Sequence, residues 1–242
     1  MSIRGLILLL VVTVAGGCVY VMNSHFSGSI GVFADAAQTT LALTFWASIL
    51  AFVFAFVSGL GKLSTLPPVR WLATAYIEIF RGSSALVQLF WLFYVLPLFG
   101  PRIDPFTAGV LGVALNVGAY GGVLVEAAIR AVPRGQQEAS IALNLSRWQR
   151  MRYVVLPQAL VLMIPPWGNL LIQLFKLTAL VSFIGISDLT YTANQLNQTT
   201  YRTVEVFTII LFFYFSIGLV ITIAMRSLAK HVNGDLALGG SR

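Results

Sequence analysis

The sequence predicts an all-α protein, a polytopic transmembrane helical bundle of about six helices that forms one domain over residues 1–242. Hydrophobic residues make up 58% of the chain and charged residues 10%, and the mean hydropathy is +0.87. This is too apolar for a water-soluble domain. Six charge-free stretches are each long enough to cross a hydrocarbon core of roughly 30 Å as a helix. None alternates polar and apolar residues as membrane strands do. They lie at residues 5–22, 36–61, 82–101, 105–125, 153–175 and 206–225.

The first predicted crossing, residues 5–22, has an alternative interpretation as a secretion signal. Arg4 precedes its apolar run, and the Ala-Gly-Gly-Cys that ends at Cys18 resembles a lipoprotein cleavage site. The apolar run continues past Cys18 to Met22, which favours a retained helix. Cys18 is the only cysteine, so the chain cannot form an intramolecular disulfide or a thiolate metal cluster. In either case the second predicted crossing, which begins at residue 36, starts on the outer side of the membrane.

The distribution of basic residues predicts the orientation of the crossings. With the N-terminus inside and six crossings, twelve basic residues fall on the cytoplasmic side and only Arg102 and Arg202 fall outside. Such an excess on the inside is typical of membrane proteins and places both termini in the cytoplasm. The net charge of +7 is therefore a topology signal and does not indicate a nucleic-acid partner. The cytoplasmic set is Arg4, Lys62, Arg70, Arg81, Arg130, Arg134, Arg147, Arg150, Arg152, Arg226, Lys230 and Arg242.

Proline pairs and polar segments divide the predicted crossings. The Pro-Pro pair at 67–68 breaks the chain after the second crossing, and residues 69–80 are expected to continue as a helix on the membrane surface. The Pro-Pro pair at 165–166 should kink the fifth crossing, because proline removes a backbone donor and crowds the preceding turn. Residues 187–203 are polar with little charge, which predicts an outer or re-entrant loop.

Between the fourth and fifth crossings, residues 133–157 predict a helix–turn–helix on the cytoplasmic face. Pro133 suits the first turn of a helix. Asn144 stands where that helix stops, because asparagine tolerates the left-handed conformation that ends many helices. Ser146 with Gln149 three residues later matches a capping box that begins a second helix.

The two expected helices carry different surfaces. The first has a face of small apolar residues, formed by Ala139, Ala142 and Leu143. The second, residues 147–154, is basic and should end at Leu156-Pro157; its charges come from Arg147, Arg150 and Arg152. A solvated connector would also explain the charges. The helix boundaries and the small-residue face favour an element that docks onto a soluble partner.

Polar side chains inside the crossings form two stripes at helical spacing. Asn116 and Tyr120 share one face of the fourth crossing, and Asn169, Gln173 and Lys176 form a stripe on the fifth. Each stripe either lines a translocation pathway or joins helices by hydrogen bonds. Lys176 requires a partner, a water-filled cavity or a route for its ammonium group to the interface.

The sequence does not predict an enzyme. Gly61-Lys62 resembles the end of a phosphate-binding loop, but Phe56 stands where glycine is needed and Leu63 where serine or threonine is needed. His25 and His231 are isolated, so we expect no metal site. No serine, histidine and acid constellation lies within the membrane portion.

Several segments, in order, resemble the permeases of ATP-binding-cassette importers of the polar amino acid branch. They are Y-I-E-I-F-R-G-S-S-A-L-V-Q-L-F (76–90), V-P-R-G-Q-Q-E-A (132–139) and P-P-W-G-N-L-L-I-Q-L-F-K-L-T-A-L-V-S-F-I-G (165–185). Residues 138–157 contain E-A-S, then Asn144, Val154 and Leu156-Pro157, and resemble the family's "EAA" loop. The resemblance covers about residues 36–230 and leaves the crossing at 5–22 as an addition to the core.

The resemblance implies a permease subunit in a bacterial inner membrane whose loop inserts into a groove of a cytoplasmic ATPase subunit. The implied partners are the ATP-binding subunits, an extracytoplasmic solute-binding protein, membrane lipid and a second permease chain, identical or related. ATP would be bound by the partner, with no cofactor in this chain. The implied coupling positions are Glu138, Ala139, Ser140, Asn144, Leu156 and Pro157, with Arg147 and Arg150 available for salt bridges.

Departures from the family pattern bear on the substrate. In the family, an acid often stands three residues after the position of Tyr120; here that residue is Val123, and Glu126 follows one turn later. An aspartate often follows the position of Lys176, and here that residue is Leu177. Fewer acids favour a polar or zwitterionic amino acid, or an amino-acid-derived compatible solute such as ectoine, over a strongly cationic substrate. Asn144 replaces the usual glycine and should preserve the turn. The alternative function is a passive channel or a membrane scaffold without ATP-coupled transport.

Overall fold

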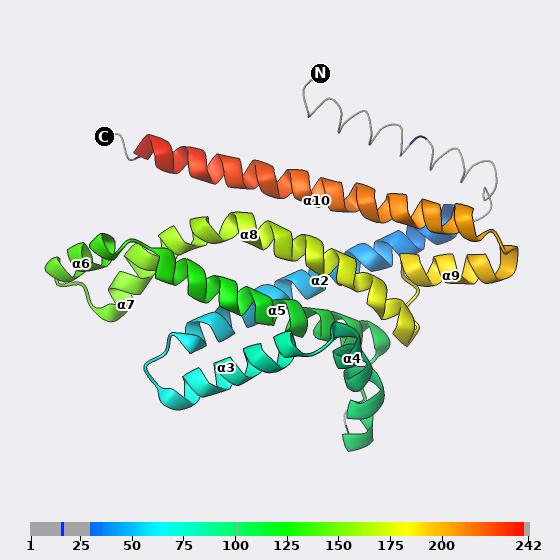
Figure 1. Cartoon of the computed structure of the whole chain (residues 1–242), viewed down its shortest axis with the longest axis horizontal. Helices are drawn as coiled ribbons and strands as arrows, with labels where there is room; N and C mark the ends of the chain where they lie inside the picture. Colours follow the sequence, from blue (N-terminus) through cyan, green and yellow to red (C-terminus); the bar gives the residue numbers. More distant parts are fainter. Residues whose placement is uncertain (1–15, 17–29, 101, 240–242) are drawn as a thin grey trace.

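The computed structural model of the chain describes residue 16, residues 30–100 and residues 102–239. The predicted crossing at 5–22 and Cys18 therefore lie outside the described residues, apart from Gly16. The regular elements in the described ranges are all helical, which confirms the predicted all-α fold (Figure 1).

Helices α2 (Ile30–Lys62) and α5 (Pro105–Ala131) form the centre of the bundle. In α5, 72% of the most apolar window is buried inside the chain, against 28% in α2. Small residues let the two backbones approach closely: a Cβ added at Gly121 would lie 2.6 Å from Ala55 Cβ, and one at Gly59 would lie 2.6 Å from Val125 Cβ. Such small-residue contacts are how membrane helices gain packing energy without a hydrophobic driving force between them.

Helix α3 (Pro67–Gly82) packs along α2 and α5, so the expectation of a surface helix at 69–80 is wrong. Ala73 and Ile77 are buried on its inner face. The Tyr76 hydroxyl donates a hydrogen bond of 2.8 Å to the Leu115 carbonyl, close to the middle of α5. One apolar face on a helix does not by itself show whether that face meets the membrane surface or other helices of the bundle.

After α3 the chain bends by 108° into α4 (Ala85–Phe90), which continues through a π-helical turn and a short 3-10 turn to Phe99. The predicted third crossing at 82–101 is thus a bent pair with α3 and not an independent straight helix. Its bend also places Arg81, assigned above to the cytoplasmic side, over the ring of Tyr120 within α5.

The described residues contain four helices long and apolar enough to cross a membrane, or five if the bent pair counts as one span. The four are Gly31–Lys62, Pro105–Ala131, Arg147–Ile184 and Thr203–Lys230. The count agrees with five of the six predicted crossings when the bent pair is included.

The C-terminal half completes the bundle. Helix α8 (Leu156–Leu177) lies between α5 and α10 (Thr203–Gly239), and it runs on through Pro165 and Pro166 (Figure 1). A 3-10 helix (Thr178–Ile184) follows α8. The stretch predicted as a loop at 187–203 folds mostly as helix α9 (Leu189–Thr200), which packs against α2 and α10. A carboxylate cap provided by Asp188 explains why this polar segment begins a helix.

Candidate functional site

The turn of the hairpin formed by residues 133–157 has the predicted geometry. Helix α6 spans Arg134–Ala142, with Pro133 at its N-cap, one position earlier than expected. Asn144 has a φ of 55°, which confirms the left-handed conformation, and its N–H donates to the Ile141 carbonyl at 2.8 Å. The chain therefore reverses at the residue whose side chain tolerates that backbone best after glycine.

The second helix begins at the predicted capping box. The Gln149 N–H donates to Ser146 Oγ at 3.3 Å, and the Ser146 N–H donates to Gln149 Oε1 at 2.9 Å. Helix α7 (Arg147–Arg150) follows directly. These reciprocal bonds satisfy two backbone donors that a helix start otherwise leaves unpaired.

The prediction that Leu156-Pro157 ends this second helix is wrong. A π-helical turn over Met151–Val155 joins α7 to α8, and the Leu156 N–H donates to the Met151 carbonyl, five residues back. The wider turn changes the hydrogen-bond register just where Pro157 supplies no donor. The hairpin is consequently continuous with a membrane-spanning helix.

The predicted coupling residues divide by exposure. Glu138, Ala139, Asn144, Arg147 and Pro157 are exposed, whereas Arg150 and Leu156 are half-buried. Ser140 is only 2% exposed, and its hydroxyl donates to the Gln137 carbonyl at 2.6 Å. Ser140, one of the implied coupling positions, thus points into the hairpin and does not belong to its outer surface.

Large apolar side chains of the same hairpin are also exposed. They are between 55% and 74% exposed and comprise Ile141, Leu143, Trp148 and Tyr153. An exposed group of this kind, with arginines beside it, is typical of a protein–protein interface, where Trp, Tyr and Arg contribute most of the binding energy. Leu143 belongs to the apolar face predicted from the sequence. Ile141, Trp148 and Tyr153 were not predicted as part of this surface, although they lie in the same hairpin.

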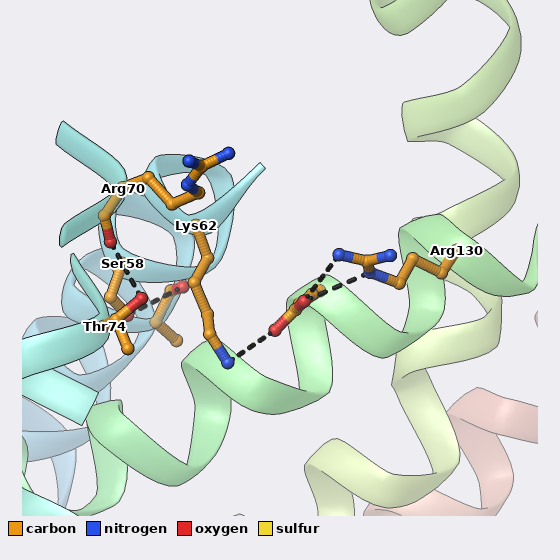
Figure 2. Close-up of polar contacts among 7 residues, drawn as sticks. Ser58, Lys62, Arg70, Thr74 and Arg130 are labelled. Carbon is orange, nitrogen blue, oxygen red and sulfur yellow. Dashed lines mark hydrogen bonds and ion pairs between the residues drawn. The ribbon is translucent and has the colours of Figure 1, made fainter. Parts of the chain in front are cut away.

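An ion-pair cluster joins the ends of α2 and α5 just before the hairpin begins. Lys62 Nζ lies 2.9 Å from Glu126 Oε2, and an Arg130 guanidinium nitrogen lies 3.0 Å from Glu126 Oε1. Figure 2 shows Lys62 and Arg130 converging from opposite sides, with the Thr74 hydroxyl bonded separately to the Arg70 carbonyl. Glu126 thus connects the last residue of α2 to the end of α5. The helical i, i+4 spacing of Glu126 and Arg130 could have indicated half of this cluster.

The first polar stripe lies against α3 and α4. Asn116 is buried, and its amide donates to the Phe80 carbonyl at 3.0 Å and to Gln88 Oε1 at 3.2 Å. Gln88 in turn donates to the Phe80 carbonyl and to Ser83 Oγ. Asn116 therefore satisfies backbone groups freed by the α3–α4 bend. Tyr120 is half-buried, with the Arg81 guanidinium 5.3 Å from its ring centroid.

The second stripe lies on a different side of the bundle. Asn169 is exposed and lines a groove of about 450 Å³ between α8 and α10. Gln173 is half-buried and Lys176 is exposed. The structure does not bring Asn169 to Asn116 or Tyr120 within one chain. Among the described residues, no group of three His, Cys, Asp or Glu side chains could hold a metal ion.

Similarity to known proteins extends over most of the chain. Residues 51–234 match the family described as binding-protein-dependent transport system inner membrane component. A probable amino-acid ABC transporter permease of Sinorhizobium fredii is 43% identical over 84% of this chain and 88% of its own length. The glutamine transport system permease of Escherichia coli is 35% identical over 78% of this chain and 90% of its own length. A crystal structure of an amino acid ABC transporter with histidines has a TM-score of 0.80 and 36% identity, covering 85% and 96% of the two chains.

Proposed function

Because the chain belongs to the family of binding-protein-dependent transport inner membrane components, we propose that it moves a polar amino acid across the membrane and that residues 133–157 dock onto its ATPase. The chain is a multi-pass permease subunit of the inner membrane, and ATP is bound by a separate subunit. The transporter complex includes those ATPase subunits and a solute-binding protein.

The geometry of the hairpin carries the docking proposal. Its turn and caps are fixed by Asn144 and by the Ser146–Gln149 capping box, so its surface is preorganised. Ala139 leaves room for a partner, and the exposed Trp148 and Arg147 offer the residue types that anchor interfaces. Glu138 and Asn144 complete the outward surface. Leu156 and Pro157 are the first two residues of α8, so they would join the docking hairpin to this helix and not end the hairpin.

The substrate proposal takes the polar amino acid class from the relatives and the charge of the substrate from this chain. One relative is a glutamine permease and another, of Bacillus subtilis, is an arginine permease that is 32% identical, so the relatives do not distinguish a neutral from a cationic amino acid. Glu126 is engaged by Lys62 and Arg130, so it does not replace the acid missing at Val123. We therefore favour a neutral polar or zwitterionic amino acid, or a compatible solute derived from one, over a strongly cationic substrate.

The arrangement in the membrane also belongs to this proposal. Only 17% of the most apolar window of α10 and 22% of that of the Arg147–Ile184 helix are buried within the chain. These faces are available to lipid and to a second permease chain, identical or related. The exposed Asn169 and Lys176 and the half-buried Gln173 would face the shared pathway, with Asn116 and Tyr120 supporting it from within. Both termini would lie in the cytoplasm, on the side of the hairpin.

Reconstituted vesicles test the docking surface. Vesicles that contain the permease, its ATPase and the solute-binding protein should take up glutamine only with ATP. Ala139→Asp introduces a charge into the interface and should lower both uptake and stimulated ATP hydrolysis at least tenfold, about 1.4 kcal/mol of coupling.

The matched control is Asn194→Asp, which adds the same charge to an exposed position of α9. It should transport normally. Unaltered uptake by Ala139→Asp would contradict the docking surface, and conduction of solute without ATP would favour the passive channel instead.

A further inference from the structure

Two opposite charges, Glu78 and Arg81, lie on α3 well inside the membrane. Arg81 contacts the ring of Tyr120, which is eleven residues from the end of α5 at Ala131, or roughly 16 Å at 1.5 Å per residue. The Phe80 carbonyl, between the two charges, is bonded by Asn116 near the middle of α5. Neither charge is therefore at the cytoplasmic surface.

Both charges lack an ion-pair partner in the described part of the chain. The ion pairs found there join Glu126 to Lys62 and to Arg130. Glu78 and Arg81 are both exposed on the isolated chain and lie one turn apart, on neighbouring positions of one helix face. Charged groups at this depth do not face lipid, because the cost of removing them from water is several kcal/mol. Their face must therefore line a water-filled pathway or contact another group of opposite charge.

We propose that Arg81 and Glu78 bind the backbone of the transported amino acid. The Arg81 guanidinium binds the α-carboxylate through two parallel hydrogen bonds, and the Glu78 carboxylate binds the α-ammonium group. Residues three apart on a helix have Cβ atoms about 5–6 Å apart, so two long side chains can converge on one zwitterion. Tyr120 is a positioning residue, because its ring contacts the Arg81 guanidinium and restricts where that group can lie.

This inference rests on the proposed function and adds to it the part of the substrate that the permease recognises. The α-carboxylate and α-ammonium groups are common to all amino acids. A site that binds both groups excludes solutes without a zwitterionic head group. Discrimination among amino-acid side chains is then left to other contacts and to the solute-binding protein.

Direct binding separates this site from the solute-binding protein. The permease–ATPase complex, without the solute-binding protein, is placed in lipid nanodiscs and titrated with radiolabelled glutamine. Arg81→Gln and Glu78→Gln should each weaken binding at least tenfold, and Arg81→Lys should weaken it less. Glutamine α-amide, which lacks the carboxylate, should compete poorly with glutamine on the wild-type complex and equally well on Arg81→Gln.

The control is Arg102→Gln, which removes an exposed arginine outside the spans and should bind glutamine like the wild type. Glu78→Gln is isosteric and exposed, so it tests the site even if Arg81→Gln fails to fold. If the wild type neither binds nor imports any amino acid, the proposed function itself fails. If the wild type imports glutamine with ATP but both neutral variants bind it unchanged, only this inference is overturned, and the two charges serve an interface with another chain.

Discussion

At the residue scale, Asp188 is a buried carboxylate that begins α9. Its Oδ1 accepts from the Tyr191 N–H at 2.8 Å, and its Oδ2 accepts from the Tyr214 hydroxyl at 3.4 Å. Burial raises the pKa of Asp188 to about 6, although these hydrogen bonds oppose the rise. The carboxyl group therefore titrates closer to neutrality than an exposed aspartate does.

The raised pKa predicts how the stability of the fold depends on pH. Because the folded state holds the Asp188 proton more tightly than the unfolded chain, its contribution is fully present below the ordinary pKa of 3.8 and is lost as the pH rises through about 6. The loss amounts to at most about 3 kcal/mol. Thermal unfolding in detergent should show the wild type losing stability relative to Asp188→Asn between pH 4.5 and 7.5.

Asp104 provides the control of opposite sign. Hydrogen bonds from Thr107 lower its pKa below 3.8, so its contribution is lost only as the pH falls below that range. Asp104→Asn should therefore shift unfolding equally at pH 5 and pH 7. If the wild type and Asp188→Asn followed parallel curves, the carboxylate would not be desolvated in the folded state.

Single residues of the hairpin were largely predictable from the sequence. Asn144 and the Ser146–Gln149 pair act on their own backbone, so their effect depends on neighbours within a few positions. The inward orientation of Ser140 was not predictable, because it depends on how α6 is seated against the segment that joins α7 to α8. Local chemistry decides caps and turns, whereas packing decides which face is free.

At the scale of elements, the contact between α2 and α5 depends on glycines that have no space for a side chain. A Cβ at Gly121 would lie 2.6 Å from Ala55 Cβ and 2.9 Å from the Trp167 ring. Gly121→Val should therefore push α5 away from α2 and α8 and destabilise the bundle by about 1–3 kcal/mol. The measurement is the thermal unfolding of the purified protein in detergent.

Gly218→Val makes the same change in α10, where an added Cβ meets nothing within 4 Å. Its unfolding temperature should stay close to that of the wild type. Equal losses in the two variants would mean that valine acts through backbone or lipid effects and not through the α2–α5 contact.

The sequence predicted which segments form long helices better than it predicted where those helices bend or join. Apolar length identified α2, α5, α8 and α10, since each must cross the same hydrocarbon thickness. It did not identify the 108° bend after α3, because the Phe80 carbonyl at the bend is satisfied partly by Asn116, which is 36 residues away in the sequence. The continuity from α7 into α8 was also not predicted. A proline usually marks a helix boundary, but here a π-helical turn before Pro157 lets the helix continue.

At the scale of the whole molecule, Glu126 links the ends of α2 and α5 next to the hairpin. Its carboxylate holds the end of α2 through Lys62 and the end of α5 through Arg130, just before the hairpin begins. Glu126→Gln leaves both cations without a carboxylate and should lower stability by about 1–2 kcal/mol. In reconstituted vesicles it should also reduce the amount of glutamine moved per ATP hydrolysed.

The two partners of Glu126 give an internal comparison. The side chain of Lys62 is 23% exposed and that of Arg130 is 66% exposed. Because exposed ion pairs contribute little, Lys62→Gln should reproduce most of the effect and Arg130→Gln only a small part. The reverse order of effects would show that the hairpin is held through α5 alone.

The unbroken helix from Arg147 to Ile184 has a mechanical consequence for transport. Its 38 residues would span roughly 57 Å as a straight helix at 1.5 Å per residue, and the segment carries the second helix of the proposed docking hairpin at one end. A tilt of about 5° at the base would displace the far tip by roughly 5 Å over that length. If the hairpin docks as proposed, a small closure of the ATPase subunits would therefore move the far end of this helix without a hinge between the two.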